Sequence, residues 1–588
     1  MCRVNVVPEE ALPLAAVDTA GVRQPPSVGR DAKRPGALIR GSVGRLADWF
    51  FRRLALWRLA QLEARDALAV QERTLLRLVR RAARTQFGRE HGFDRIHSVA
   101  DFQKRVPLRC YEQFWQRYWQ PRFPQVGGIT WPETPPYWAL SSGTTSGQTK
   151  YLPVTRELLW SNRQAALSIF GAYFACEPHT RLLHGRLFFL GGSTDLENLG
   201  GGICAGDLSA IVQVETPRWL RPFVWPTTAV ALLRDWEDKI RILAEESPAQ
   251  PITLLAGVPS WLMVLLERVK AVTGCRHLLE IWPDLRLLVH GGVCFEPYRA
   301  WFHRELGQFG VRLVESYPSS EAFVAFEDVR YGQLRLLPDH GIFFEFVPWQ
   351  ELSQERPTRH TLREIERGVP YAVVVTTCAG LWAYVLGDVV RFESRQPPLL
   401  RFVGRTGYFL SAFGEHLIGE EVEKALARAA QKSGATVSDF HVGPVFAGVD
   451  ATEPDSVSAT ELSRPRPADP GRAAPGWHRY LVECQEQIAD LQQFAAWLDE
   501  ELSRANADYH AHRQGDLSLG PPEVVLLRPG SFAEWLRRQG KLGGQHKVPR
   551  MDNSGQLTRQ LYRFFTETGA VLQTVTSAPP RQAHSCRS

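Results

Sequence analysis

Residues 141–150 read Ser-Ser-Gly-Thr-Thr-Ser-Gly-Gln-Thr-Lys. The two glycines, Gly143 and Gly147, let the backbone approach an anion closely, while the hydroxyls around them and the final lysine supply donors and positive charge. A Walker loop would need glycine at position 148, where the chain has Gln148, and the dinucleotide fingerprint is absent as well. The segment therefore predicts a phosphate-binding loop, against the plainer alternative of a surface turn rich in serine and glycine.

Length and composition favour a large globular protein. The chain has 588 residues, of which 44 % are hydrophobic and 22 % are charged, so it can form more than one packed unit with sizeable cores. No run of about 18 apolar residues is present, and the N-terminus lacks the apolar stretch of a secretory signal. We expect no integral membrane association, and the default location is cytoplasmic.

The cysteines and the net charge argue against three further kinds of protein: disulfide-bonded, zinc-binding and nucleic-acid-binding. Nine cysteines are scattered without a Cys-x-x-Cys pair, which favours reduced thiols over disulfides or a zinc site. The net charge of +6 is small for this length and gives no reason to expect nucleic acid as a partner. Only nine of the 69 basic residues are lysines. A lysine in a glycine-rich loop is therefore a stronger indication of a functional role than an arginine would be.

Hydrophobic patterning predicts a large N-terminal domain over residues 41–404, after an N-terminal extension, 1–40, that we expect to be disordered. Residues 46–84 have a helical pattern with a basic outer face, which we interpret as an ordinary solvated helix face rather than a membrane-binding one. Further on, short apolar runs alternate with helical stretches. The runs predicted to be strands are 187–190, 252–255, 285–289, 312–314, 342–346 and 372–376. This alternation predicts an α/β fold with mixed, at least partly parallel, sheets.

A second unit with a different sequence pattern follows. Residues 405–572 predict a small, mobile C-terminal α+β domain, interrupted by a flexible loop at 452–476 and followed by a disordered tail, 573–588. Within it, Ser531 and Glu534 have the spacing of a capping box. We expect the boundary near Arg405 to act as a hinge.

Three motifs together resemble a known family. Residues 141–150 resemble the phosphate loop of the adenylate-forming (acyl-CoA synthetase-like) superfamily. Residues 317–321, Tyr-Pro-Ser-Ser-Glu, and 384–388, Tyr-Val-Leu-Gly-Asp, resemble two further nucleotide motifs in the form used by the auxin-responsive promoter (Gretchen Hagen) family of acyl acid amido synthetases. Segments 257–261, 290–293 and 402–407 also resemble parts of that family, and the similarity extends over about residues 85–553.

The resemblance implies a set of ligand contacts. ATP phosphates would bind to Ser142, Gly143, Thr144, Thr145, Gly147 and Lys150. Adenine and ribose would bind to Gly291, Gly292, Tyr317, Asp388 and Arg405. Glu321 would hold Mg²⁺, and Lys547 would act at the reacting carboxylate and α-phosphate. Lys541 is the second candidate for this role. For Glu321 and Lys547 the plainer reading is a solvated loop residue. Trp261 and Phe323 are candidates for the acyl pocket, although core packing is the commoner role of such side chains.

The resembled family activates a carboxylic acid as an acyl adenylate, with release of pyrophosphate, and then forms an amide with an amino acid. The resemblance therefore implies an ATP- and Mg²⁺-dependent ligase. Separately, we expect a monomer. Plant members carry arginines in the third motif, whereas this chain has Ala383 and Val385 beside Tyr384, so plant substrates cannot be transferred to it. Two alternatives stay open: an acyl-CoA ligase that uses coenzyme A as acceptor, and a nucleotide-binding protein without turnover.

Overall fold

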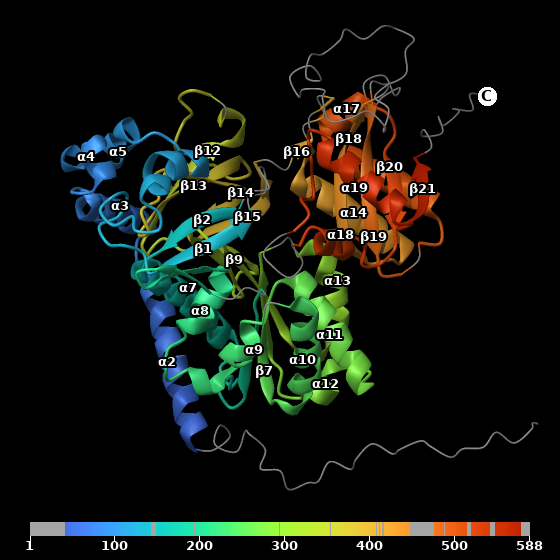
Figure 1. Ribbon diagram of the computed structural model, residues 1–588, viewed down its shortest axis with the longest axis horizontal. Coiled ribbons are helices and arrows are strands. Elements are labelled where there is room, and N and C mark those ends of the chain that lie inside the picture. Colours follow the sequence, from blue (N-terminus) through green and yellow to red (C-terminus); the bar gives the residue numbers. More distant parts are fainter. Residues whose placement is uncertain are drawn as a thin grey trace, which may run out of the picture.

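The computed structural model describes most of the chain between residues 42 and 577. The described ranges are 42–142, 149–192, 196–233, 235–292, 295–352, 354–406, 409–410, 412–413, 415, 417–446, 476–486, 488–513, 519–540 and 547–577. The extension predicted at 1–40 lies outside them, as does the loop predicted at 452–476 except for Gly476. Figure 1 shows a large unit and, beside it, a smaller unit drawn in orange and red that contains the C-terminal elements.

An 11-stranded mixed sheet forms the centre of the large unit, in the order β12-β13-β14-β15-β11-β10-β9-β8-β7-β3-β6. Its parallel part consists of β6 (Val224–Trp225), β3 (Arg186–Leu190), β7 (Ile252–Gly257), β8 (Leu287–Gly291) and β9 (Arg312–Pro318). Its antiparallel part consists of β10 (Phe323–Asp328), β11 (Gln333–Leu336), β15 (Pro398–Arg405), β14 (Tyr384–Arg395), β13 (Pro370–Thr377) and β12 (Ile342–Pro348). All six apolar runs predicted as strands lie within or overlap strands of this sheet.

The parallel strands are apolar on both faces because helices cover both. Leu254 and Leu287 belong to a core cluster with α2 (Ser42–Ala64) and α7 (Arg156–Cys176). Their neighbours Leu255 and Leu288 belong to a second cluster with α10 (Trp236–Glu246), α11 (Pro259–Thr273) and α13 (Glu296–Glu305). This two-sided burial explains the uninterrupted apolar runs in the sequence.

A four-stranded sheet next to the large sheet carries the predicted phosphate loop. Its strands, in the order β2-β1-β5-β4, are Thr149–Val154, Tyr137–Ser142, Ile203–Gly206 and Glu197–Gly200. The sequence analysis predicted no strand at β2. Helix α7 follows it and begins after Thr155, whose side chain accepts a hydrogen bond from the Leu158 N–H.

The N-terminal helices differ from each other on their outer faces. Helix α3 (Ala67–Ala82) fits the prediction, with exposed arginines outside and Leu75, Leu78 and Val79 buried. For α2 the predicted basic solvated face is wrong: several large apolar side chains are exposed there. The remaining shorter helices are α4 (Gln86–Glu90), α5 (Val99–Arg105), α6 (Tyr111–Phe114), α8 (Leu208–Val214), α9 (Thr228–Ala231) and α12 (Leu278–Ile281).

The small unit is a four-stranded sheet with helices. The strands, in spatial order, are β18 (Val437–Phe446), β19 (Gly476–Cys484), β20 (Glu523–Leu527) and β21 (Val571–Thr576). The helices are α14 (Gly419–Ser433), α16 (Leu491–Ala505), α17 (Ala507–Arg513), α18 (Ser531–Arg538) and α19 (Gln556–Glu567), and a short pair, β16 (Phe409–Leu410) and β17 (Leu417–Ile418), precedes them.

Two details of the small unit differ from the expectations. Gly530, not Ser531, is the N-cap of α18 and makes no side-chain cap bond, so the predicted capping box is wrong; Glu534 instead accepts a 2.8 Å hydrogen bond from Arg528. Strand β21 continues to Thr576 by pairing with β20, so ordered structure extends into the segment predicted as a tail.

The two units contact each other through α13. This helix packs against α14 and β18, and the Arg550 guanidinium lies 3.3 Å from the Tyr298 hydroxyl of α13. Arg537 of α18 also pairs with Glu237 of α10. These contacts hold the small unit against the carboxyl ends of the parallel strands.

Candidate active site

The carboxyl ends of three parallel strands bring the first site residues together. In the register of the sheet, Gly257 of β7 lies beside His290 of β8, and Gly291 lies beside Ser316 of β9. A Cβ atom on Gly291 would lie 2.3 Å from the Ser316 carbonyl oxygen, and Gly292 has a φ of +80°. Both positions therefore require glycine, and the adenine-binding role of these residues stays a prediction.

A tight turn between β9 and β10 presents Glu321. The Ser319 N–H donates to the Ala322 carbonyl at 2.9 Å, and the Ser319 hydroxyl accepts a 3.0 Å hydrogen bond from the Ala322 N–H. These two hydrogen bonds fix the turn that separates Tyr317 from Glu321. The sequence analysis quoted Ser319 only as part of a motif and missed its structural role.

Asp388 lies at the centre of a polar cluster formed by β9, β14 and β15. Its Oδ2 accepts a 2.7 Å hydrogen bond from the Tyr317 hydroxyl, and its Oδ1 accepts a 2.9 Å hydrogen bond from Arg405 Nε. Gly387, with a φ of +86°, turns the backbone immediately before the aspartate. Each carboxylate oxygen can accept more than one hydrogen bond, so Asp388 keeps acceptor capacity for two sugar hydroxyls.

The Tyr317 side chain is itself buried, with 8 % of its surface exposed. Burial, and next the negative charge of Asp388, raise the pKa of the Tyr317 hydroxyl well above its ordinary value. The hydroxyl therefore stays protonated and acts as a hydrogen-bond donor. Its ring packs edge-on against Phe402 with the ring centres 5.6 Å apart.

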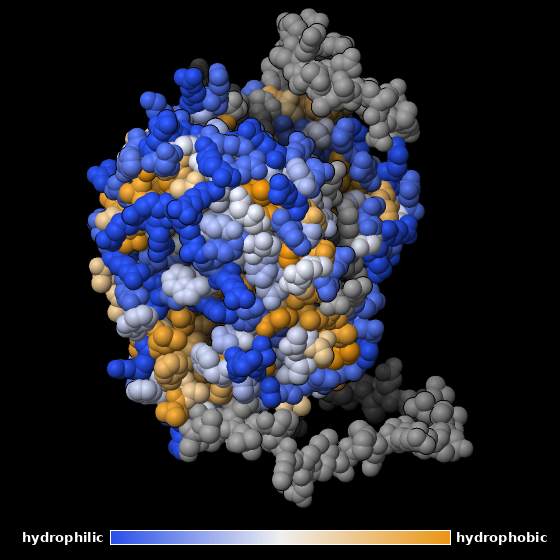
Figure 2. Space-filling model, turned by 60° about the vertical axis from the view of Figure 1, so that its left-hand side comes forward, coloured by the Kyte–Doolittle hydropathy of each residue, from blue (hydrophilic) through white to orange (hydrophobic). Residues whose placement is uncertain are grey.

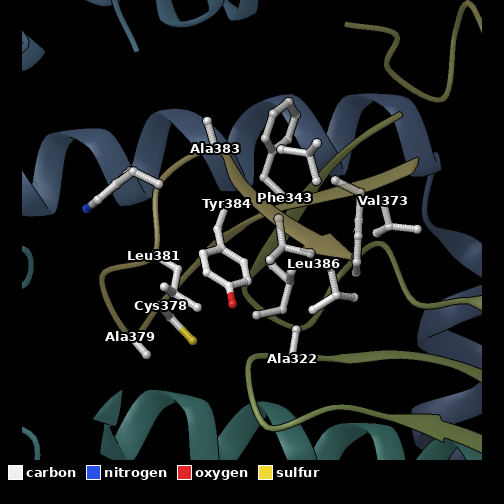
Figure 3. Close-up of a cluster of buried hydrophobic side chains, with 14 of the residues drawn as sticks. Ala322, Phe343, Val373, Cys378, Ala379, Leu381, Ala383, Tyr384 and Leu386 are labelled. Carbon is white, nitrogen blue, oxygen red and sulfur yellow. The ribbon is translucent and has the colours of Figure 1, made fainter. Parts of the chain in front are cut away.

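Glu321 faces Tyr384 across the site. The Tyr384 hydroxyl donates a 3.0 Å hydrogen bond to Glu321 Oε1. In Figure 3 the Tyr384 ring lies among buried apolar side chains, and its hydroxyl points to the side of the view where Ala322 lies. Burial raises the pKa of Glu321, while the positive charges of Lys150 and Arg405 oppose that rise.

The backbone beside Tyr384 is strained. Ala383 has a φ of +46°, in the region that favours glycine. The Ala383 carbonyl accepts a 3.0 Å hydrogen bond from the Arg109 N–H, and the Val385 N–H donates to the Arg109 carbonyl at 2.9 Å. These bonds fix the orientation of β14 where the Tyr384 side chain leaves it.

Glu321 fits a magnesium ion that takes its other ligands from phosphate. Within the described part of the chain no group of three or more His, Cys, Asp or Glu side chains could hold a metal ion. Mg²⁺ bound to a nucleotide needs only one or two protein carboxylates, because phosphate oxygens and waters fill the remaining positions. A cation beside the partly buried Glu321 would also compensate its charge.

The predicted phosphate loop is only partly described. Ser142 ends β1 and pairs with Thr149, while Ser141 pairs with Lys150. Gly143, Thr144, Thr145 and Gly147 lie outside the described residues. Lys150 is the second residue of β2, and its Nζ lies 5.2 Å from the centre of the Tyr111 ring.

Lys547 reaches the same site from the small unit. Its Nζ donates a 2.9 Å hydrogen bond to the Gly292 carbonyl and lies 5.9 Å from the centre of the Trp261 ring. Burial, and after it the positive charge of Arg550, lower the pKa of Lys547 to about 7. Lys541 lies outside the described residues.

The site therefore combines contributions from both units: the Tyr317–Asp388–Arg405 cluster, an acid suited to Mg²⁺, and a lysine from the small unit. Together with the mixed sheet and the small α+β unit, these groups define a two-unit α/β protein with a polar site where the units meet. Three domain models of the GH3 family match the chain, the N-terminal domain at residues 58–212, the central domain at 335–405 and the C-terminal domain at 420–556. The chain belongs to the GH3 family, and the family prediction is confirmed.

Named relatives of the chain agree with this family assignment. The chain is 24 % identical to a jasmonoyl-L-amino acid synthetase, JAR4, of Nicotiana attenuata over 83 % of this chain and 91 % of the relative. It is 30 % identical to a probable indole-3-acetic acid-amido synthetase, GH3.9, of Oryza sativa subsp. japonica, over 46 % of this chain and 61 % of that relative's length.

Among solved structures, the GH3.15 acyl acid amido synthetase superposes with a TM-score of 0.68 at 18 % identity, covering 89 % of this chain and 97 % of that one. A 2-hydroxyisobutyryl-CoA ligase in its postadenylation state gives a TM-score of 0.50 at 14 % identity, covering 88 % and 92 %. These likenesses confirm the predicted fold class.

Proposed function

We propose that this chain is an acyl acid amido synthetase that uses ATP and Mg²⁺. In the first step the carboxylate oxygen of an acid attacks the α-phosphorus of ATP, and pyrophosphate leaves. In the second, an amino acid amine attacks the acyl carbon, AMP leaves, and the amine gives up a proton. The observation that carries the proposal is that Arg405 connects three residues from separate parts of the chain. It donates a hydrogen bond to Asp388, and its charge acts to lower the pKa of both Glu321 and Lys547.

Each residue has a role that its surroundings support. Asp388, held by Tyr317 and Arg405, would accept the ribose hydroxyls, and Gly291 and Gly292 would let adenine approach the backbone. Glu321 would hold Mg²⁺, which neutralises phosphate charge during the displacement. Lys547 would neutralise charge at the carboxylate and α-phosphate, and Ser142, Gly143, Thr144, Thr145, Gly147 and Lys150 would bind the outer phosphates.

Trp261 marks the side from which the acid would approach. If the reacting carboxylate meets Lys547, the acyl group lies near the Trp261 ring, whose centre is 5.9 Å from Lys547 Nζ. We further propose a monomer in the cytoplasm. The six cysteines that lie in the described part of the chain are free thiols, which supports a reducing compartment.

Acid-dependent exchange of pyrophosphate into ATP tests the first step. We expect exchange with some members of a panel of aromatic, fatty and keto acids, strongly reduced in Asp388→Ala. Asp94→Ala is the matched control, because Asp94 lies at the surface with 74 % of its side chain exposed. ATP binding without exchange for any acid would favour a nucleotide-binding protein without turnover.

A second assay separates the two acceptors. Acids that support exchange are incubated with ATP and either a mixture of amino acids or coenzyme A, and the products are identified by mass. We expect an amide. A thioester formed with coenzyme A and no amide with any amino acid would assign the chain to the acyl-CoA ligases instead.

A further inference from the structure

The outer face of α2 exposes large apolar side chains. Leu46, Trp49, Phe50 and Trp57 are 68 %, 58 %, 51 % and 56 % exposed. Their spacing places all four on one face of a helix with 3.6 residues per turn. The exposed Trp219 extends the patch, because its ring meets the Phe50 ring edge-on with the centres 6.1 Å apart. We call these five side chains the α2 patch.

Folding of the large unit does not need this face. The opposite side of α2 is already buried, through Phe51, Ala55, Leu59 and Leu62 in the core cluster shared with α7. In Figure 1 α2 runs along the edge of the large unit, and Figure 2 shows apolar side chains gathered toward the lower left of the molecule, where α2 lies. The α2 patch is therefore a convex ridge of aromatic groups, which points to a binding partner.

The charge around the α2 patch is positive. Arg53 is exposed on the same face, with its guanidinium carbon 5.8 Å from the centre of the Trp49 ring. Arg45, next to Leu46, is also exposed. The two acids of α2 are already engaged. Asp48 is buried and accepts a 2.8 Å hydrogen bond from the Leu183 N–H, and Glu63 pairs with Arg330 at 2.7 Å and with Arg335.

We propose that the α2 patch binds the surface of an anionic lipid bilayer, with α2 lying in the plane of the interface. Tryptophan and phenylalanine rings insert at the boundary between headgroups and acyl chains, while arginines on the same face contact lipid phosphates. A convex ridge suits a deformable planar surface, whereas a peptide partner would need a groove. The proposal is independent of the proposed catalytic function.

A second copy of the chain fits this surface less well. A two-fold dimer formed through α2 would bring its exposed arginines close to their own copies, and Glu63 is already paired with Arg330 and Arg335. Like charges that face each other across an interface are unfavourable. An anionic bilayer supplies the missing negative charge.

Vesicle flotation with the full-length protein tests the proposal. We expect binding to vesicles that contain roughly 30 % phosphatidylserine in phosphatidylcholine, weak binding to phosphatidylcholine alone, and release at about 0.5 M salt. The double variant Trp49→Ser, Trp57→Ser should reduce the bound fraction at least about fivefold, and Arg53→Glu should remove the preference for phosphatidylserine. The melting temperature of each variant should match that of the wild type.

The matched control is Val264→Ser on α11, an apolar side chain that is 50 % exposed but lies outside the α2 patch. It should bind vesicles as the wild type does. Absence of vesicle binding by the wild-type protein, or equal binding by the double tryptophan variant, would overturn the proposal. A wild-type dimer that the double variant converts to a monomer, without any vesicle binding, would assign the α2 patch to self-association instead.

Discussion

The Lys547 ammonium of the small unit donates a 2.9 Å hydrogen bond to the backbone carbonyl of Gly292, 255 residues away in the large unit. The small unit is thus oriented with this lysine at the proposed nucleotide site. In the proposed two-step reaction this arrangement would serve activation of the acid, because the lysine would face the atoms where charge develops.

Removing this ammonium should impair one half-reaction more than the other. We expect Lys547→Ala to slow formation of the acyl adenylate by about 100-fold, the usual effect of losing one electrostatic contact to the transition state. Transfer from a supplied acyl adenylate to an amino acid should stay within about threefold of the wild type. Single-turnover assays of each step provide the measurement, and equal loss in both steps would contradict this division of roles.

The lowered pKa of Lys547 predicts a pH effect. Burial and the Arg550 charge lower the pKa of Lys547 to about 7, so the free enzyme carries the ammonium below that pH and loses it above. The value of kcat/KM for adenylation, which reports groups of the free enzyme, should therefore fall as the pH rises through about 7. Lys547→Arg keeps its charge at high pH, so its residual kcat/KM should lack this fall; the same inflection in that variant would assign it to another group.

The hydrogen bonds around Asp388 predict that two substitutions lower kcat/KM for ATP by different amounts. Asp388→Ala removes the acceptor for ribose and leaves Tyr317 and Arg405 without their partner, so we expect kcat/KM for ATP to fall by an amount equivalent to about 2 to 4 kcal/mol. Tyr317→Phe keeps the ring and loses one hydrogen bond, and should cost about 1 kcal/mol. Near-normal kinetics in Asp388→Ala would rule out its role at the ribose.

Tyr384 should strengthen Mg²⁺ binding through its hydrogen bond to Glu321. Tyr384→Phe deletes only the hydroxyl that donates to Glu321 Oε1 at 3.0 Å, and loss of such a supporting contact typically weakens metal binding by about 10-fold or more. We expect a higher Mg²⁺ concentration for half-maximal exchange, and weaker Mg²⁺-dependent binding of ATP in calorimetry.

Tyr371→Phe is the matched control for Tyr384→Phe. The Tyr371 side chain is 1 % exposed, and its hydroxyl accepts a 2.9 Å hydrogen bond from the Glu366 N–H. Its Mg²⁺ dependence should be unchanged. A parallel shift in both variants would point to general loosening of the sheet rather than to Glu321.

The regular part of the fold could be predicted from sequence because burial leaves a local pattern. Strands β7 and β8 appear as unbroken apolar runs, since α10 and α11 cover one face and α2 and α7 the other. Strand β2 was missed because Pro153 and the preceding glycine-rich loop are typical of irregular structure. It is an edge strand, where proline is tolerated.

The site could be predicted only as separate motifs. The residue types at Tyr317, Glu321, Asp388 and Lys547 were recognisable in their segments, but their partners are distant in sequence. Tyr317 and Asp388 are 71 residues apart, and Glu321 and Tyr384 are 63 apart. Local spacing carries no information on such contacts, so the pairing of each acid with a particular tyrosine required the three-dimensional structure.

A buried ion pair predicts the largest effect on stability outside the site. Arg58 on α2 donates two hydrogen bonds to Asp339, at 2.7 and 2.6 Å, and Arg65 adds a third at 2.8 Å. Burial alone would raise the pKa of the Asp339 carboxyl, but the hydrogen bonds and charge of Arg58, together with the charges of His340 and Arg65, hold the pKa below its ordinary value of 3.8. The pair therefore stabilises the fold above that pH, and its contribution is lost as the pH falls through the lowered value.

Arg58→Ala should lower the free energy of unfolding by about 3 kcal/mol at neutral pH, because it leaves the Asp339 carboxylate buried with only the more exposed Arg65 as partner. Urea denaturation followed by tryptophan fluorescence measures the change. Arg81→Ala is the control: its pairs with Glu133 and Glu157 are exposed, so its removal should cost less than about 1 kcal/mol. Equal effects of the two substitutions would show that burial does not set the strength of the Arg58–Asp339 pair.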